Sequence, residues 1–256
     1  MNVIKIVYVG ILGLIAGSFL TVVVHRLPSG GSIVAPRSFC PTCHAPIRPI
    51  DNVPVLSYLL RRGRCRNCQT RIPPRYLALE LVTGALFAAV AARVASPWEI
   101  PAYCVLAASL VALSAIDLMY MRLPSKIIYT TGAIGAVLLV VASAGTHEWG
   151  ALLRALIAGA ASFGVVLVIH LVVPRGMGFG DVRLAGLCGG FLGWLGYRFD
   201  VTGIWLGFIV GGSFALALVA VGKASRGSHM PFGPFLAFGT MVAVFLGPEI
   251  AHLQLP

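Results

Sequence analysis

The sequence predicts an all-α, polytopic membrane protein with about eight transmembrane helices. Composition is the first reason, because 58% of the 256 residues are hydrophobic and only 11% are charged. A soluble domain of this length could not bury so much apolar surface, and the mean hydropathy of +0.92 agrees. The second reason is that apolar stretches long enough to cross ~30 Å of hydrocarbon recur along most of the chain. No strand-like alternation is visible, which favours helices over a membrane β-barrel.

The apolar stretches are each bounded by charge, proline or glycine. They cover residues 3–24, 76–95, 102–119, 128–145, 150–173, 183–198, 203–222 and 232–248. The first begins near Lys5, as a secretion signal would, but it is long and lacks a small-residue cleavage site. His25 and Arg26 follow it, so we interpret it as an uncleaved helix with a cytoplasmic basic flank.

The basic residues predict the orientation. If the N-terminus is outside, eight spans place 25–75, 120–127, 174–183 and 223–231 in the cytoplasm, and these segments hold 15 of the 19 basic residues. Four of the eight acidic residues fall on the opposite side. This asymmetry is what the positive-inside rule requires, and one span more or fewer would destroy it.

The net charge of +11 also raises the question of nucleic acid. The charge is concentrated in one loop beside the membrane, without a nucleic-acid-binding motif and with few aromatic residues to stack on bases. Attraction to anionic lipid head groups accounts for it more simply, so we expect membrane lipids and no nucleic acid as partners.

The large cytoplasmic loop, residues 25–75, carries two C-x-x-C motifs separated by 21 residues. Their members are Cys40, Cys43, Cys65 and Cys68. The pattern resembles a zinc ribbon, in which four thiolates close a tetrahedral, structural Zn²⁺ site. Disulfides and free thiols are the alternatives, and a cytoplasmic location disfavours disulfides. His44, which adjoins Cys43, is either a spare ligand or a solvated loop histidine.

Three acidic residues, Glu80, Asp117 and Asp181, lie within or at the edge of predicted spans. An ionisable group at membrane depth is costly unless it is paired or wetted, so it suggests function. Asp117 ends the third span and Asp181 opens the sixth, and both fall near the cytoplasmic face. Two carboxylates at one depth can share a proton and activate a water, as in aspartic proteases.

Asp181 closes the segment GMGFGD, residues 176–181. The glycines Gly176, Gly178 and Gly180 predict backbone angles barred to other residues and a close approach of a substrate strand to the chain. The alternative is a glycine-rich turn between helices with an aspartate N-cap.

With these motifs the chain resembles the type IV prepilin peptidases, which are GxGD-type membrane aspartyl proteases and bifunctional leader peptidase/N-methyltransferases. The matching segments, in family order, are GSFLTVVVHRLP (17–28), the two C-x-x-C pairs, NVPVLSYLLRRGRCRNC (52–68), RYLALELVTG (75–84), IDLMYMRLP (116–124), GMGFGDVRLAG (176–186) and PFGPFLAFG (231–239). Ser125 and Arg183 depart from the family pattern, because an acid and a lysine are common at these positions.

The resemblance implies removal of the basic leader of prepilin or pseudopilin substrates at the cytoplasmic face of the bacterial inner membrane. It also implies methylation of the new N-terminus from S-adenosyl-L-methionine. Asp117 and Asp181 would be the catalytic pair, with Gly178 and Gly180 in the substrate-site loop. The implied domains are a first transmembrane helix (1–24), a four-cysteine zinc-binding domain (25–75) and a seven-helix peptidase domain (76–256).

Other classes fit less well. A proton-coupled transporter is the main alternative, because intramembrane carboxylates also relay protons; transporters usually show repeated halves and a midplane site, and we find neither. A zinc metalloprotease would need H-E-x-x-H, which the sequence lacks. His170 and Glu80 are interpreted as packed or snorkelling helix residues, with Glu80 able to orient part of the cytoplasmic domain.

Overall fold

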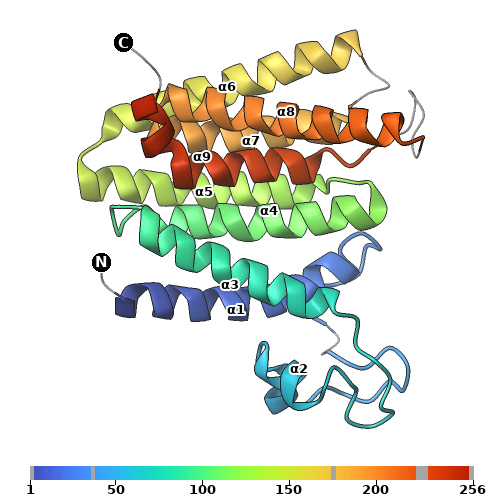
Figure 1. Ribbon diagram of the computed structural model, residues 1–256. Helices are drawn as coiled ribbons and strands as arrows, with labels where there is room; N and C mark the ends of the chain where they lie inside the picture. The colour runs from blue at the N-terminus through green and yellow to red at the C-terminus, as the bar shows by residue number, and fades with distance from the viewer. Residues whose placement is uncertain (1–2, 36–37, 174–176, 223–229, 254–256) are drawn as a thin grey trace. The chain divides into compact units, whose positions relative to one another are not determined.

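The computed structural model describes residues 3–35, 38–173, 177–222 and 230–253, and these are almost entirely helical (Figure 1). The helices of the described residues are α1 (Val3–Arg26), η1 (Pro49–Asn52), α2 (Leu56–Leu60), α3 (Arg75–Arg93), α4 (Ile100–Tyr120), α5 (Ser125–Thr146), α6 (Trp149–Val172), α7 (Phe179–Leu195), α8 (Tyr197–Ala220) and α9 (Gly233–Leu253). The same residues form no strand, only two isolated β-bridges. The predicted all-α class is confirmed.

Each predicted span corresponds to one long helix. Within the described part of the chain, α1, α3, α4, α5, α6 and α8 are long and apolar enough to cross a membrane. α7, with 17 residues, is shorter, as is the apolar stretch Gly233–Leu246 of α9. The protein is therefore a polytopic helical membrane protein, with six helices meeting the length criterion directly.

Two predicted helix starts were wrong, and in both cases charged residues lie within the first turns of the helix. α7 begins at Phe179, not at residue 183, because Asp181 and Arg183 lie within its first turns. α8 begins at Tyr197, not at residue 203, so Asp200 lies in its first turn and is buried. Ser162 of α6 donates to this carboxylate at 2.8 Å, which satisfies the buried charge and ties α8 to α6.

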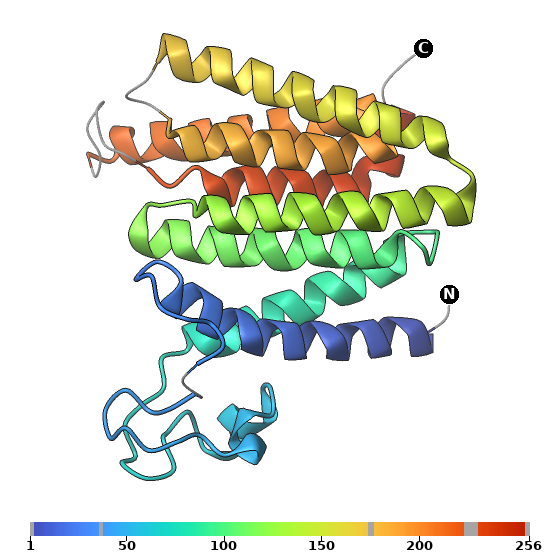
Figure 2. The same cartoon turned by 180° about the vertical axis from the view of Figure 1, so that it is seen from behind.

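The chain forms two compact units, Met1–Ala92 and Arg93–Pro256, here called the N-terminal and C-terminal units. In the N-terminal unit α1 and α3 lie side by side, as the two opposite views show (Figures 1 and 2). Glycines of α1 let the two helices approach closely, because a Cβ on Gly13 would lie 2.7 Å from Phe87 Cβ and one on Gly17 would lie 2.7 Å from Glu80 Cα. The segment between the two helices carries α2 and the cysteines.

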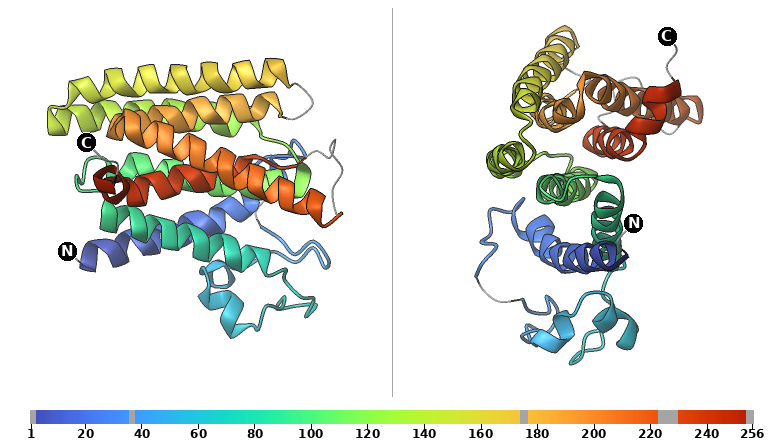
Figure 3. Two further views of the ribbon diagram at one scale, coloured as in Figure 1. Left: turned by 45° about the horizontal axis from the view of Figure 1, so that its top comes forward. Right: turned by 90° about the vertical axis from the view of Figure 1, so that its left-hand side faces the viewer.

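The C-terminal unit is a bundle of α4 to α9, whose axes follow a roughly common direction in the end-on view (Figure 3). α7 is a core helix: it packs against α5, α6, α8 and α9, and most of its side chains are buried. α4 also belongs to the core, and the hydroxyl of Tyr103 donates to the carbonyl of Phe191 in α7 at 2.9 Å. This buried hydrogen bond holds the first part of α4 against the last part of α7.

Candidate active site and metal centre

Asp117 lies in the last turn of α4 and is only 5% exposed. The helix ends three residues later at Tyr120, because Met121 takes a left-handed conformation and its N–H closes on the Asp117 carbonyl at 2.8 Å. The backbone N–H of Gly233, at the start of α9, donates to Asp117 Oδ2 at 3.0 Å. This buried hydrogen bond fixes the orientation of the carboxylate.

Asp181 lies in the first turn of α7 and is also buried. Its Oδ2 accepts a hydrogen bond of 3.1 Å from the backbone N–H of Gly178, the N-cap residue. The other oxygen, Oδ1, is buried and has no hydrogen-bond partner among the residues that the structure describes. Asp181 therefore caps the helix from its third position, not from the N-cap itself. Its Oδ1 remains available as a hydrogen-bond acceptor.

The structure brings the two carboxylates to the same end of the bundle, although 64 residues separate them. The contact of Tyr103 with Phe191 sets α4 and α7 antiparallel, so the end of α4 meets the start of α7. There, Asp117 and Asp181 lie close enough to interact electrostatically. Leu123, in the α4–α5 loop, lies between Gly180 and Gly233 and so joins the two halves of the site.

The expectation about glycine backbone angles was wrong for Gly178 and Gly180. Gly178 has a φ of −76°, an extended conformation open to any residue, and Gly180 lies inside α7 without a positive φ. What Gly180 provides is close approach, because a Cβ there would lie 2.9 Å from Leu123 Cβ. Gly176 lies outside the described residues.

The sequence did not predict a role for Gly233, which lies in the segment PFGPFLAFG. A Cβ at this position would lie 2.9 Å from Asp117 Oδ2 and 3.1 Å from Leu123 Cδ2. A side chain here must therefore displace the carboxylate or the loop. The residue type does not indicate this role, because the group that binds Asp117 is a backbone N–H.

We expect Gly233→Ala to lower the turnover number for leader cleavage by about 10- to 100-fold, since displacements near 1 Å at a reacting group have effects of this order. Gly164→Ala is the matched control, because a Cβ at this α6 position meets no atom within 4 Å. Steady-state assays of both purified variants measure the difference. Equal turnover in the two would contradict the role of Gly233.

His170, near the end of α6, lies close to Asp181 as well. Its Nδ1 is 2.8 Å from the Met177 carbonyl oxygen, and its ring packs at a tilt on Phe179, with centroids 5.9 Å apart. It is thus a packed residue, as predicted, and it holds the backbone just before Gly178.

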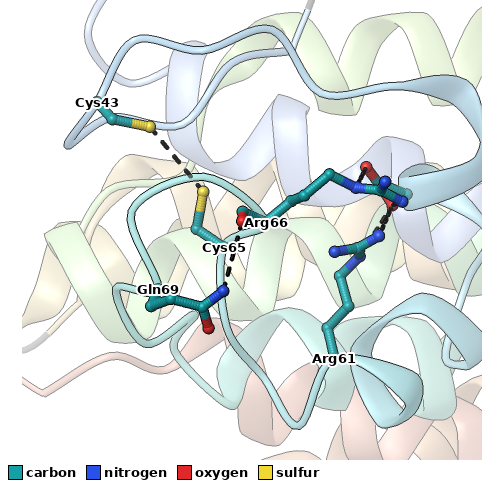
Figure 4. A network of polar contacts seen from close by, with 6 residues as sticks. Cys43, Arg61, Cys65, Arg66 and Gln69 are labelled. Carbon is teal, nitrogen blue, oxygen red and sulfur yellow. Dashed lines mark hydrogen bonds and ion pairs between the residues drawn. The ribbon is translucent and has the colours of Figure 1, made fainter.

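The four cysteines of the N-terminal unit converge on one point. The sulfur atoms of Cys40, Cys43, Cys65 and Cys68 all lie within 4.8 Å of one another. The sulfur atoms of Cys40 and Cys68 are 3.8 Å apart. Those of Cys43 and Cys65 are 4.0 Å apart (Figure 4). All are free thiols, so the disulfide alternative is not realised.

The two C-x-x-C turns have the same backbone design. In the first, the Cys40 N–H donates to the Ala45 carbonyl, and Phe39 bridges Pro46. In the second, the Cys65 N–H donates to the Thr70 carbonyl, with an equivalent bridge from Arg64 to Arg71. The two turns thus present their pairs of thiols in the same way, and the two pairs meet at the sulfur cluster.

This geometry fits zinc. Four sulfurs at ~2.3 Å from a tetrahedral Zn²⁺ lie roughly 3.8 Å apart, close to the two separations observed. Hydrogen bonding with the Thr70 side chain and backbone lowers the pKa of Cys68 to about 6, which favours its thiolate. A hydrogen bond from the Ala45 backbone acts to lower the pKa of Cys43, but burial and the other three thiols outweigh it and raise this pKa to about 11. His44 stacks on Phe39 with ring centroids 5.9 Å apart and is not part of the cluster.

A charged network supports the second cysteine turn. Arg61 and Arg66 both bind the carboxylate of Asp51, through Nε atoms at 2.8 and 3.0 Å (Figure 4). These contacts, the hydrogen bond from Arg66 above all, lower the pKa of Asp51. Any stability the network contributes is therefore present at neutral pH and lost only as the pH falls through this lowered value.

Glu80 orients part of the loop, as the sequence suggested. One carboxylate oxygen of this α3 residue accepts a 2.7 Å hydrogen bond from the backbone N–H of Val55. Val55 has a φ of 61°, an unusual conformation for a β-branched residue. The hydrogen bond holds this strained residue, the N-cap of α2, against the membrane helix.

Comparison with known proteins agrees with the site. Residues 11–94 match the family described as the bacterial peptidase A24 N-terminal domain, and residues 104–247 match the type IV leader peptidase family. The prepilin leader peptidase/N-methyltransferase of Bacillus subtilis (strain 168) is 32% identical over 241 residues, which cover 94% of each chain. The protein of that name from Burkholderia pseudomallei (strain 1026b) is 35% identical, covering 93% of this chain and 84% of its own. No solved structure matches the chain. The chain belongs to the type IV leader peptidase family.

Proposed function

We propose that this protein removes the leader peptide from prepilin or pseudopilin substrates and methylates the new N-terminal residue. The observation that carries the peptidase half is the buried pair of Asp117 and Asp181, held at one end of the C-terminal unit by backbone N–H groups. Family membership and the names of the relatives support both halves. They give no support to the transporter alternative.

In the proposed mechanism the pair shares one proton, because two adjacent like charges cannot both form cheaply. Asp181 is assigned as the base, since its Oδ1 is a buried acceptor that no described residue occupies. Asp117, whose Oδ2 is held by the Gly233 N–H, is assigned as the acid. The two N–H groups keep both carboxylates in place without neutralising them.

Asp181 takes a proton from a water molecule, and the oxygen of that water attacks the scissile carbonyl carbon. Asp117 donates its proton to the carbonyl oxygen, which gives a neutral diol. The diol then collapses: the C–N bond breaks as the leaving nitrogen takes the proton from Asp181, and Asp117 takes the proton of one diol hydroxyl. The leader departs as a carboxylic acid, and the pair returns to its starting protonation state. The pilin is left with a free N-terminal amine, which is the group to be methylated.

The N-terminal unit is assigned a supporting role. Zn²⁺, held by Cys40, Cys43, Cys65 and Cys68, would be structural, because four thiolates leave no position for substrate. It would replace the apolar core that this short loop cannot build by itself. S-adenosyl-L-methionine, the methyl donor that a methyltransferase of this family implies, would supply the methyl group for the amine.

The proposed location is the bacterial inner membrane, with the N-terminus outside and the cysteine loop in the cytoplasm. The distribution of basic residues supports this topology, and anionic head groups would contact the basic loop. A cytoplasmic active site is where a basic leader would be retained, because positive segments remain on that side.

Co-expression with candidate prepilins and mass spectrometry of the pilin N-terminus test the proposal. We expect a pilin that has lost its leader and gained one methyl group on the new terminal amine. Leader removal without methylation would restrict the protein to the peptidase activity. Intact leaders on every pilin and pseudopilin tried, with folded enzyme in the membrane, would refute the proposal.

A further inference from the structure

A guanidinium group in the second turn of α7, two residues after Asp181, is held by neutral partners. Arg183, two residues after Asp181 in α7, donates a hydrogen bond from Nη1 to the hydroxyl of Ser125, the first residue of α5. Its guanidinium carbon lies 4.5 Å from the ring centroid of Phe179 and 5.8 Å from that of Tyr129. Cation–π contacts of this kind stabilise a charge that has been withdrawn from water.

The contact is the polar end of a long seam between α5 and α7. Further along, a Cβ on Gly132 of α5 would lie 3.7 Å from Leu187, and Gly135 faces the ring of Phe191. Arg183, Leu187 and Phe191 are spaced by four residues, which places them on one face of α7. The apolar part of the seam holds the helices together, and the hydrogen bond fixes their register at the catalytic end.

This register determines where Asp181 lies relative to Asp117. Asp117 is joined to Ser125 through the last turn of α4 and a short loop, so the start of α5 moves with Asp117. Arg183 is joined to Asp181 within one helical turn, so it moves with Asp181. The Ser125–Arg183 hydrogen bond closes this path and thereby sets the separation of the two carboxylates.

We propose that Ser125 and Arg183 form a positioning pair that holds the two aspartates at working distance. The inference rests on the proposed function, because it assumes that Asp117 and Asp181 perform the cleavage. The two residues that depart from the pattern of the resembled family contact each other. A hydroxyl accepts from the guanidinium without neutralising it, so this pair retains a positive charge that an acid would cancel.

Five variants, assayed for leader cleavage by the purified full-length protein, test the pair. Arg183→Gln should lower the turnover number by about 10- to 100-fold with little change in KM, as expected for loss of geometry at the reacting groups. Ser125→Ala should act in the same direction but less strongly, because the cation–π contacts remain. In the double variant the losses should not add, since either change alone already breaks the hydrogen bond. Arg183→Lys should keep an intermediate turnover number. This remaining activity should be lost when Arg183→Lys is combined with Ser125→Ala.

Arg154→Gln is the matched control. Arg154 is also half-buried and also binds α7, through the Trp194 carbonyl at 3.4 Å, but at the opposite end of the helix. The Arg154→Gln change should leave the turnover number unchanged. If it lowered turnover as much as Arg183→Gln, general anchoring of α7 would replace the positioning pair.

Thermal unfolding of each variant separates positioning from stability. If Arg183→Gln does not fold, the comparison of Arg183→Lys with and without Ser125 decides the question. Additive losses, or an effect confined to KM, would overturn the positioning role. Asp181→Asn in the same assay tests the premise that the aspartates perform the cleavage. If this variant cleaves the leader, the proposed function is wrong. If it is inactive while the Arg183 variants cleave normally, only the positioning role of Ser125 and Arg183 is wrong.

Discussion

Asp117→Asn and Asp181→Asn are each expected to lower leader cleavage by at least about 10³-fold, because an amide can neither hold the shared proton nor accept one from water. The loss should appear in the turnover number, since neither change removes bulk from the site. Both variants should insert and fold normally, because an asparagine oxygen can still accept the Gly233 or Gly178 N–H. Steady-state assays of purified protein with a prepilin substrate measure the effect.

Asp200→Asn is the matched control for these variants. Asp200 is as buried as Asp181, with 7% exposure in each case, but its carboxylate, at the start of α8, is occupied by the Ser162 hydroxyl. An asparagine there can still accept from that hydroxyl, so cleavage should remain within about threefold of the unchanged protein. Wild-type cleavage by either Asp117→Asn or Asp181→Asn would remove that residue from the catalytic pair.

Replacing Cys40 and Cys43 together by serine is expected to abolish zinc binding and methylation. Two of four thiolate ligands disappear, and a small loop without a core depends on its metal for folding. Cleavage should fall less than methylation, because the aspartates belong to helices of the other unit. Metal analysis of the purified protein should show about one zinc before the change and none after it.

The double variant Cys104→Ala/Cys188→Ala is the control, because it also removes two of the six cysteines. Both residues are buried in the C-terminal unit and do not belong to the sulfur cluster. Zinc content should be unchanged in this protein. Stoichiometric zinc in the Cys40→Ser/Cys43→Ser protein would show that the metal is not held by the four cysteines.

The helices were predictable because hydrophobic length is a strong signal in a membrane protein. The signal failed at α7 and α8, where Asp181, Arg183 and Asp200 lie inside the first turns. A prediction from hydropathy ends a helix at such charges, whereas in the structure they bind the Gly178 N–H, the Ser125 hydroxyl and the Ser162 hydroxyl.

The carboxylates and thiols of the candidate site could be predicted from the sequence. Ionisable groups at membrane depth are energetically costly, and paired C-x-x-C motifs are typical of metal sites. Its backbone groups were not predictable. Gly233 lies 116 residues from Asp117 and acts through an N–H that every residue except proline possesses. The contact of Ser125 with Arg183 also depends on the helix packing, which no local pattern specifies.

Mass spectrometry of the pilin N-terminus, after incubation with Asp181→Asn enzyme, most directly tests whether cleavage and methylation use separate sites. The enzyme is given uncut prepilin in one reaction and pre-cleaved pilin with a free N-terminal amine in the other, both with S-adenosyl-L-methionine. We expect the prepilin to keep its leader and the pre-cleaved pilin to gain a methyl group, because methyl transfer needs no aspartate-activated water. Removal of the leader by this enzyme, or failure to methylate the pre-cleaved pilin while the unchanged protein does so, would contradict the assignment of the two activities to separate sites.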